Sequence, residues 1–299
     1  MSNAAYLTAK RTVDDRALDD RILERFAAEL ADCEPPVRIV EVGAGTGTMV
    51  ARLAARGLLP EWVTYRAVDR VEAHVEQARA DVPRWLDEAG YETTVDGGTV
   101  QATGDTLDLT LSLEVADAFG SEDGADALIA GAFLDLVSLP DALERLATLT
   151  DAGGLLYAPI TYDGMTGFAP THPLDGTVQR LYHRHMSEER EQPGSPTAGR
   201  ELLDAVPAVG GTVLEVAGAD WIIRPRSGDY PAREALVVDH LLETIVGAIG
   251  EFRPETLAPS RREGWAETRR AQLAAAELTY VAHNLDVLAR LPGAEDEGS

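Results

Sequence analysis

A glycine-rich turn between an apolar strand and a helix is the feature that most constrains how this chain folds. Residues 37–42 are mostly β-branched and apolar, as expected of a strand buried inside a parallel sheet. The next five residues are Gly43-Ala44-Gly45-Thr46-Gly47, and residues 49–56 then have helical character. Glycine at such a turn lets a ligand approach the backbone closely and permits positive φ. The segment therefore predicts a ligand held over the end of the first strand.

Strand and helix patterns alternate after this turn. The pattern predicts strands at 64–68, 107–115, 127–130 and 155–160, helices at 71–89 and 140–149, and a hairpin at 93–100. Before the turn, residues 14–30 carry apolar side chains at the spacing of one helix face. This alternation is typical of an α/β fold with a doubly wound, Rossmann-like sheet, in which ligands bind at the carboxyl ends of the strands.

The chain divides into five segments. Residues 1–36 form an amino-terminal helical segment and residues 37–160 the ligand-binding core. Residues 161–196 are rich in proline and glycine, which favours an irregular inserted lid. Residues 197–292 would complete the sheet, with a strand at 212–223, helices at 197–206, 231–249 and 259–276, and a last strand at 278–288. The polar tail 293–299 is expected to be frayed.

Composition narrows the class of partner. The formal net charge of −25 opposes binding to phosphate backbones and anionic lipid surfaces, so we expect neither a nucleic acid nor a membrane partner. Lys10 is the only lysine among 26 basic residues, and this acidic, arginine-rich composition resembles that of halophilic, haloarchaeal proteins. A single cysteine, Cys33, excludes an internal disulfide and a cysteine-based metal site. No apolar run is long enough for a membrane helix, so a cytoplasmic location is expected.

The spacing of the glycines separates two classes of ligand. A dinucleotide fingerprint would place its third glycine at position 48, where this chain has Thr48, and the third glycine stands instead at Gly47. An acid, Glu41, precedes the first glycine by two residues. In these residues the chain resembles the class I S-adenosylmethionine-dependent methyltransferases, whose first motif reads acid-x-Gly-x-Gly-x-Gly. The alternative is a purely structural turn.

The resemblance implies S-adenosyl-L-methionine as cofactor and assigns residues to its parts. Glu41 and the run Gly43, Ala44, Gly45, Thr46 and Gly47 would hold the methionine end. Asp69, at the end of the second strand, would accept hydrogen bonds from the ribose hydroxyls, with Arg70 beside the adenosine, although such an acid is also a common helix N-cap.

Two further expectations depend on the resemblance. Asp117 and Ala118 would hold the adenine, with Asp105 as the competing acid, and Arg11 could meet the methionyl carboxylate. The strands at 212–223 and 278–288 could form the antiparallel pair that closes the seven-stranded sheet of the family.

The lid carries the candidates for catalysis. Proton removal from a methyl acceptor needs a group that titrates near the working pH, and residues 162–185 contain an unusual density of histidine and tyrosine. Tyr162, His172 and His183 are the candidate catalytic residues, and for each a structural role is the alternative. No third ligand stands at a diagnostic distance from His183 and His185, so no metal site is expected. His74 and His240 lie on helices and have the pattern of ordinary surface or half-buried positions.

These observations favour a methyltransferase that acts on a small organic molecule. The proline-rich signature of enzymes that methylate nucleobase amines is absent, which agrees with the negative charge. Two alternatives remain open: an S-adenosylmethionine-binding protein without catalytic activity, and an NAD(P)-dependent oxidoreductase on a similar sheet. A homodimer is compatible with the sequence.

Overall fold

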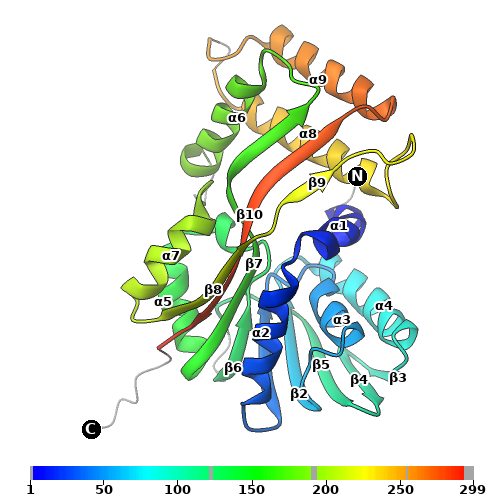
Figure 1. The fold of residues 1–299 in the computed structure, drawn as a ribbon, viewed down its shortest axis with the longest axis vertical. Helices are drawn as coiled ribbons and strands as arrows, with labels where there is room; N and C mark the ends of the chain where they lie inside the picture. Colours follow the sequence, from blue (N-terminus) through cyan, green and yellow to red (C-terminus); the bar gives the residue numbers. More distant parts are fainter. Residues whose placement is uncertain (1–2, 121–123, 190–193, 254, 293–299) are drawn as a thin grey trace.

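One twisted sheet runs through the whole molecule, which we describe from a computed structural model (Figure 1). The structure describes residues 3–120, 124–189, 194–253 and 255–292. The described strands are β1 (Val37–Val42), β2 (Trp62–Asp69), β3 (Glu92–Asp96), β4 (Thr99–Gly104), β5 (Leu107–Val115), β6 (Ala125–Ile129), β7 (Thr150–Ala169), β8 (Thr212–Gly218), β9 (Trp221–Ile223) and β10 (Thr279–Arg290). Their order is β3-β4-β5-β2-β1-β6-β7-β10-β8, and β9 pairs with β10.

Helices cover both faces of this sheet. The described α-helices are α1 (Asn3–Ala17), α2 (Asp20–Ala31), α3 (Thr48–Ala55), α4 (Glu72–Glu88), α5 (Leu139–Leu149), α6 (Asp175–Arg184), α7 (Ala198–Ala208), α8 (Glu234–Gly250) and α9 (Pro259–Ala274), with a 3₁₀ turn η1 (Leu134–Leu136) and a π turn η2 (His185–Glu189). One core joins the sheet to α1–α4, α6, α8 and α9, and a second joins it to α5 and α7.

The parallel strands β5, β2, β1, β6 and β7 confirm the doubly wound, Rossmann-like fold. β1 shows why its sequence suits this position: Val37 and Ile39 pack into one core, and Val40 and Val42 pack into the other. A strand that is buried on both faces needs such a continuous apolar run. The antiparallel pairs β10–β7 and β10–β8 complete the sheet, as expected for residues 212–223 and 278–288.

Several sequence expectations need correction. The described part of the sheet has ten strands instead of seven, because the hairpin β3–β4 extends one edge and β9 is separate from β8. The single helix expected at 14–30 is two helices, α1 and α2. Asp19 divides them as the N-cap of α2, where its side chain accepts hydrogen bonds from the N–H groups of Arg21 and Ile22.

The segment 161–196, which was expected to be irregular, is mostly regular where the structure describes it. β7 continues to Ala169 because β10 supplies hydrogen-bond partners along this whole length, from Leu155 paired with Arg290 to Ala169 paired with Thr279. α6 follows, and residues 190–193 lie outside the described residues, as does the tail 293–299. Gly164 and Gly167 lie within β7 and Gly176 lies within α6, so the glycines of this segment do not prevent regular structure.

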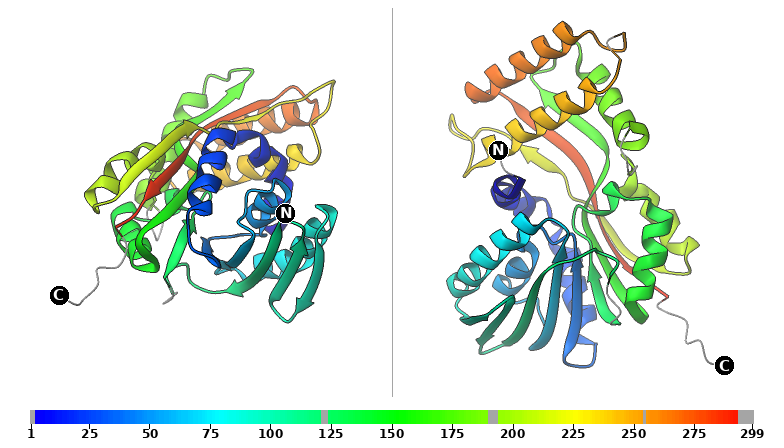
Figure 2. Two further views of the ribbon diagram at one scale, coloured as in Figure 1. Left: turned by 60° about the horizontal axis from the view of Figure 1, so that its bottom comes forward. Right: turned by 180° about the vertical axis from the view of Figure 1, so that it is seen from behind.

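The long strands β7 and β10 carry a second lobe, which we call the cap. They extend past the parallel strands and are flanked there by α6, α8, α9 and β9, while α1 lies between the cap and the core (Figures 1 and 2). The cap and the core therefore face each other at the carboxyl ends of β1, β2, β5 and β6. In the described ranges, no helix combines the length and the apolar character that crossing a membrane requires.

Candidate functional site

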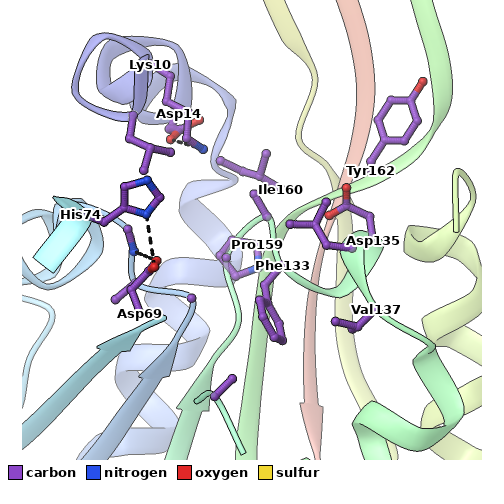
Figure 3. A pocket seen from close by; sticks show the side chains of 18 of the residues that line it. Lys10, Asp14, Asp69, His74, Phe133, Asp135, Val137, Pro159, Ile160 and Tyr162 are labelled. Atoms are coloured by element: carbon purple, nitrogen blue, oxygen red, sulfur yellow. Dashed lines mark hydrogen bonds and ion pairs between the residues drawn. The ribbon is translucent and has the colours of Figure 1, made fainter. Parts of the chain in front are cut away.

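A cavity of about 930 Å³ lies where the cap faces the carboxyl ends of the parallel strands. The loops after β1, β2, β5 and β6 form its floor, and α1, α6, α8, β7, β9 and β10 contribute its walls. Figure 3 shows Lys10, Asp14, Asp69 and His74 on one side of it and Phe133, Asp135 and Tyr162 on the other. This is the edge of a doubly wound sheet at which ligands bind.

The glycine loop forms the centre of the floor. Gly43, Gly45 and Gly47 all have positive φ, at 65°, 56° and 71°. A Cβ on Gly43 would lie 2.7 Å from Phe133, so this turn accepts only glycine. Gly43, Ala44, Gly45 and Thr46 line the cavity. Gly47 does not line it; this residue is the N-cap of α3, and a Cβ there would meet Val82 of α4 at 2.6 Å.

Asp69 ends β2 beside the glycine loop, and its carboxylate is already largely occupied by the protein. Its Oδ2 accepts a hydrogen bond from the N–H of Gly45 at 2.9 Å, and its Oδ1 accepts one from Val71 at 2.8 Å. Nδ1 of His74 lies 3.2 Å from the same Oδ1. A carboxylate offers about four lone-pair sites, so three partners leave room for about one more. Asp69 can thus bind one ligand hydroxyl without rearrangement, instead of the two that the sequence suggested.

Glu41 is a buried acid at the end of β1 that reaches the cavity. Its side chain is 4% exposed, and Tyr65 donates a hydrogen bond to its Oε2 at 2.7 Å. Burial raises the pKa of Glu41 to about 7, against the opposing effects of the Tyr65 hydrogen bond and of the nearby Arg52. Glu41 can therefore change its charge near neutral pH in response to a ligand.

Arg52 is a cation of this site that the sequence did not reveal. It lies on α3, is 4% exposed and lines the cavity, and its Nε donates to Asp15 at 2.6 Å. Its Nη2 is buried without a hydrogen-bond partner. Arg11, which the sequence suggested for this role, does not line the cavity and lies over the Trp85 ring at 4.5 Å. Arg52 lies on the helix that follows the glycine loop, and its spacing from the loop could have identified it as a residue of this site.

The loop after β5 forms one end of the cavity. Asp117, Ala118 and Phe119 line it, as does the exposed side chain of Arg70. The guanidinium of Arg145 lies 3.9 Å from the centre of the Phe119 ring and 3.8 Å from Asp117. Asp105 lies in the turn between β4 and β5 and does not line the cavity. Asp117 thus lines the same cavity as the glycine loop, and Asp105 does not.

The opposite end is walled mainly by aromatic side chains, and we call it the aromatic chamber. Its rings come from six different elements of the chain: Tyr6, Tyr162, Tyr182, Trp221, His240 and Tyr280. The ring centroids of Tyr6 and His240 lie 4.2 Å apart. No local pattern predicts that Tyr6, Trp221, His240 and Tyr280 meet, because only the fold brings α1, α8, β9 and β10 together.

Two of the three candidate catalytic residues meet here. The hydroxyl of Tyr162 lies 2.8 Å from Nε2 of His183 and 2.6 Å from the hydroxyl of Thr166. Burial raises the pKa of Tyr162, and burial also lowers the pKa of His183. Tyr162 lines the cavity, whereas His183 lies behind it. A neutral phenol hydrogen-bonded to a neutral imidazole can transfer a proton from the cavity outward.

The third candidate, His172, stands apart from the cavity. It lies in the turn before α6, where its Nδ1 accepts a hydrogen bond from the N–H of Leu174 at 3.1 Å and its own N–H donates to Asp175. These contacts give His172 a structural role in the turn. His74, by contrast, was expected to be an ordinary surface or half-buried residue, but it is 5% exposed, lines the cavity and has a buried Nε2 without a partner.

Buried polar atoms without partners gather around this one cavity. Six of the described residues that carry such an atom line it: Asp14, Thr46, Arg52, His74, Trp221 and His240. Four others lie elsewhere: Tyr157, His185, Arg262 and Arg269. Buried polar groups in folded proteins normally have hydrogen-bond partners, so this clustering indicates space for a polar ligand. In the described parts of the chain, no three His, Cys, Asp or Glu side chains come together in a way that could hold a metal ion.

The sequence matches no family model, and no curated protein matches it. Solved structures with a similar course of the chain include an S-adenosylmethionine-dependent methyltransferase from Thiobacillus denitrificans in complex with S-adenosyl-L-homocysteine. It is 16% identical, with a TM-score of 0.47, and the match covers 96% of this chain and 98% of the other.

Two further structures match at the same level. One is an S-adenosylmethionine-dependent methyltransferase from Geobacter sulfurreducens, at 17% identity and TM-score 0.47, covering 95% of this chain and 97% of the other. The other is a cyclopropane synthase from Mycobacterium tuberculosis, at 12% identity and TM-score 0.47, covering 96% and 94%. At TM-scores below 0.5, these likenesses assign neither a substrate nor site residues to this chain, whose fold class follows from its own sheet order.

Proposed function

We propose that this chain is an S-adenosylmethionine-dependent methyltransferase that acts on a small organic molecule. The observation that carries the proposal is one continuous cavity in which Glu41, the loop 43–46, Asp69 and Asp117 line one part and the aromatic chamber forms the other. Its volume of about 930 Å³ is near the upper end of the roughly 300–1,000 Å³ of ordinary ligand pockets, which suits a cofactor together with an acceptor.

The residues of the floor fit the parts of the cofactor. The loop from Gly43 to Thr46 offers backbone groups at close range, and the unpartnered guanidinium nitrogen of Arg52 suits the methionyl carboxylate. Asp69 has one lone-pair site left for a ribose hydroxyl. Phe119 and Asp117 suit the adenine, through ring contact and hydrogen bonding. When bound, the cofactor supplies an electrophilic methyl group on a positively charged sulfur.

The chain's own contribution to the reaction is alignment, exclusion of water and removal of a proton. α1 covers the glycine loop so closely that a Cβ on Gly45 would lie 3.2 Å from Leu7. The cap closes the chamber from the other side, so two reactants would be held together away from solvent. The hydroxyl of Tyr162 would accept the acceptor's proton while passing its own proton to Nε2 of His183.

The position of the chamber beside two packed helices supports a small acceptor. α1 and α8 contact each other here, with the rings of Tyr6 and His240 4.2 Å apart, and this leaves less room for a polymer strand at this point. The net charge of −25 also opposes a nucleic acid.

Isothermal titration calorimetry with S-adenosyl-L-homocysteine and with NAD tests the proposal directly. We expect saturable one-to-one binding of S-adenosyl-L-homocysteine and no heat with NAD; the reverse result would support an oxidoreductase. Incubation with S-adenosylmethionine carrying a labelled methyl group then separates an enzyme from a binding protein. Label transferred to an acceptor from a panel of amines, phenols and carboxylic acids supports the enzyme, and binding without any transfer contradicts it.

A further inference from the structure

The aromatic chamber already holds an ammonium group, which belongs to the chain itself. Nζ of Lys10 lies 5.2 Å from the centre of the Trp221 ring and 3.1 Å from Oδ2 of Asp14. Lys10 is the chain's only lysine, and its side chain is only 13% exposed. A cation over an aromatic face gains more when it is desolvated, as it is here. The wall of the chamber thus has the chemistry that attracts an ammonium group.

The other rings surround the neighbouring space. The pKa of Tyr6 is raised chiefly by burial. The carboxylate of Asp14, the phenol of Tyr182 and the carboxylate of Asp135 raise it further, in that order. Burial and the phenols of Tyr162, Tyr182 and Tyr6 likewise raise the pKa of Tyr280. All four phenols and both carboxylates line the same cavity. Because their pKa values are raised, Tyr6, Tyr162 and Tyr280 offer ring faces and neutral hydroxyl groups.

The charged groups of the chamber favour a positive guest. Asp14 and Asp135 are carboxylates, and Lys10 is the cation that lies over a ring of the chamber. The other cations that line the cavity belong to the glycine-loop helix and the end near the loop after β5: Arg52, Arg70 and Arg145. Asp14 is 4% exposed, and its Oδ1 is buried without a hydrogen-bond partner. A buried carboxylate oxygen that lacks a donor is stabilised by an added positive charge or N–H group.

The sign of the charge separates two classes of methyl acceptor. An amine nitrogen that receives a methyl cation becomes positive, so positive charge moves into the chamber during the reaction. An oxyanion that receives it becomes neutral, so negative charge disappears from the chamber. Groups of opposite charge placed where charge develops accelerate a reaction. Two carboxylates and six aromatic rings line this part of the cavity, and such groups stabilise a developing positive charge.

On this basis we propose that the methyl acceptor is an amine, bound in the aromatic chamber and converted to a more substituted amine or ammonium. The inference rests on the proposed methyltransferase function. The nitrogen lone pair forms the new N–C bond, and the C–S bond breaks with its electron pair remaining on sulfur. Where the nitrogen carries a proton, that proton leaves toward Tyr162 and then His183.

Matched pairs of cationic and neutral probes test this inference. The pairs are choline with 3,3-dimethylbutan-1-ol, and (3-hydroxyphenyl)trimethylammonium with 3-tert-butylphenol, each titrated into the full chain with and without saturating S-adenosyl-L-homocysteine. We expect at least one cation to bind ten times or more tightly than its neutral partner. Equal or weaker binding of both cations, or stronger binding of benzoate than of either cation, overturns the proposal.

Variants connect the binding to the chamber. Asp135→Asn and Tyr6→Leu should each weaken binding of the preferred cation by five times or more. Asp105→Asn changes an exposed acid in the turn between β4 and β5, away from the cavity, and should leave this binding unchanged. Retained binding of S-adenosyl-L-homocysteine by each variant shows that it is folded. If the unaltered chain binds the cation but not S-adenosyl-L-homocysteine, the proposed function fails while the chamber's preference stands, so the two failures are distinguishable.

Discussion

The backbone N–H of Gly45 donates a hydrogen bond to Oδ2 of Asp69 across 2.9 Å, and this bond joins the glycine loop of β1 to the end of β2. The same carboxylate accepts from Val71 and lies beside His74, so Asp69 organises the floor of the cavity as well as facing a ligand. A residue with both roles should affect stability and binding together.

Asp69→Asn tests this double role. An amide group can offer only one acceptor oxygen, so one backbone N–H of Gly45 or Val71 would face an NH₂ group. We expect a loss of about 1–3 kcal/mol in the free energy of unfolding and at least tenfold weaker binding of S-adenosyl-L-homocysteine. Urea denaturation and calorimetry measure the two effects. Asp105→Asn, at an exposed turn away from the cavity, should change neither.

Arg52 offers a second test of the cofactor assignment. Arg52→Gln removes the cation whose Nη2 lacks a partner, and it should weaken binding of S-adenosyl-L-homocysteine by ten times or more. Arg56→Gln is the matched control, because Arg56 follows α3 and pairs with the exposed Asp20. Equal affinities of the two variants would contradict the assignment of Arg52 to the methionyl carboxylate.

Local patterns in the sequence were enough to predict the core of the fold. β5 has the predicted bounds, and the hairpin β3–β4 forms around the predicted turn, because glycine turns and apolar alternation act over a few residues. The glycine loop was predicted for the same reason: Gly43 is required by the backbone and by its contact with Phe133. The local backbone conformation of such a motif explains its residues, so the motif can be recognised from the sequence.

The chamber and the cap depend on contacts between distant residues, and no local pattern contains them. β7 continues beyond Ile160 because β10, more than a hundred residues later, pairs with it. Tyr6 and His240, which are separated by most of the sequence, are in ring contact. Composition suggested an irregular lid, since proline and glycine punctuate residues 161–196, but the long pairing determined the outcome. The prediction that His74 is an ordinary surface or half-buried residue was wrong. Its burial depends on the position of the cavity, which the residue pattern of its helix does not show.

The contact between Tyr162 and His183 predicts a specific kinetic effect. Tyr162→Phe removes the hydroxyl that lies 2.8 Å from Nε2 of His183 and should lower kcat with a primary or secondary amine by about 10²-fold or more. Binding of S-adenosyl-L-homocysteine should not change. His183→Gln should lower kcat in the same way and remove the acid limb of the pH–rate profile. An unchanged kcat in both variants would limit catalysis to alignment of the reactants.

The cap has its own stabilising ion pair. Nη2 of Arg269, a fully buried residue of α9, donates to both oxygens of Asp175 at 2.5 and 2.6 Å, and Trp265 donates to the same carboxylate at 2.9 Å. Burial alone would raise the pKa of Asp175, but these hydrogen bonds lower it below its ordinary value. Arg269→Met should reduce the free energy of unfolding by about 3–5 kcal/mol, because it leaves a carboxylate without its partner.

Urea denaturation measures this loss, and Arg270→Met, the neighbouring substitution at a more exposed position, should cost much less. The effect of Arg269→Met should also shrink in acid. A carboxyl group with a lowered folded-state pKa contributes stability above its unfolded pKa and loses that contribution as the pH falls through the folded value. A loss of equal size at every pH would place the role of Arg269 in packing alone.

Glu41 gives the opposite dependence on pH. Its folded-state pKa of about 7 lies above the ordinary value of 4.5, so the folded chain binds this proton more tightly than the unfolded chain does. Between pH 4.5 and 7 the unfolding free energy therefore falls as the pH rises, by up to about 3 kcal/mol from this group. Glu41→Gln keeps a side-chain oxygen for the hydroxyl of Tyr65 and removes the titration.

The difference between Glu41→Gln and the unaltered chain isolates this group from the many other acids that titrate in the same range. We expect the two proteins to be about equally stable near pH 4.5, and the variant to become progressively more stable up to pH 7 and to remain so above it. Urea denaturation of the ligand-free proteins at constant ionic strength measures the difference. A difference that does not grow with pH would show that Glu41 is ionised throughout, held in that state by Arg52.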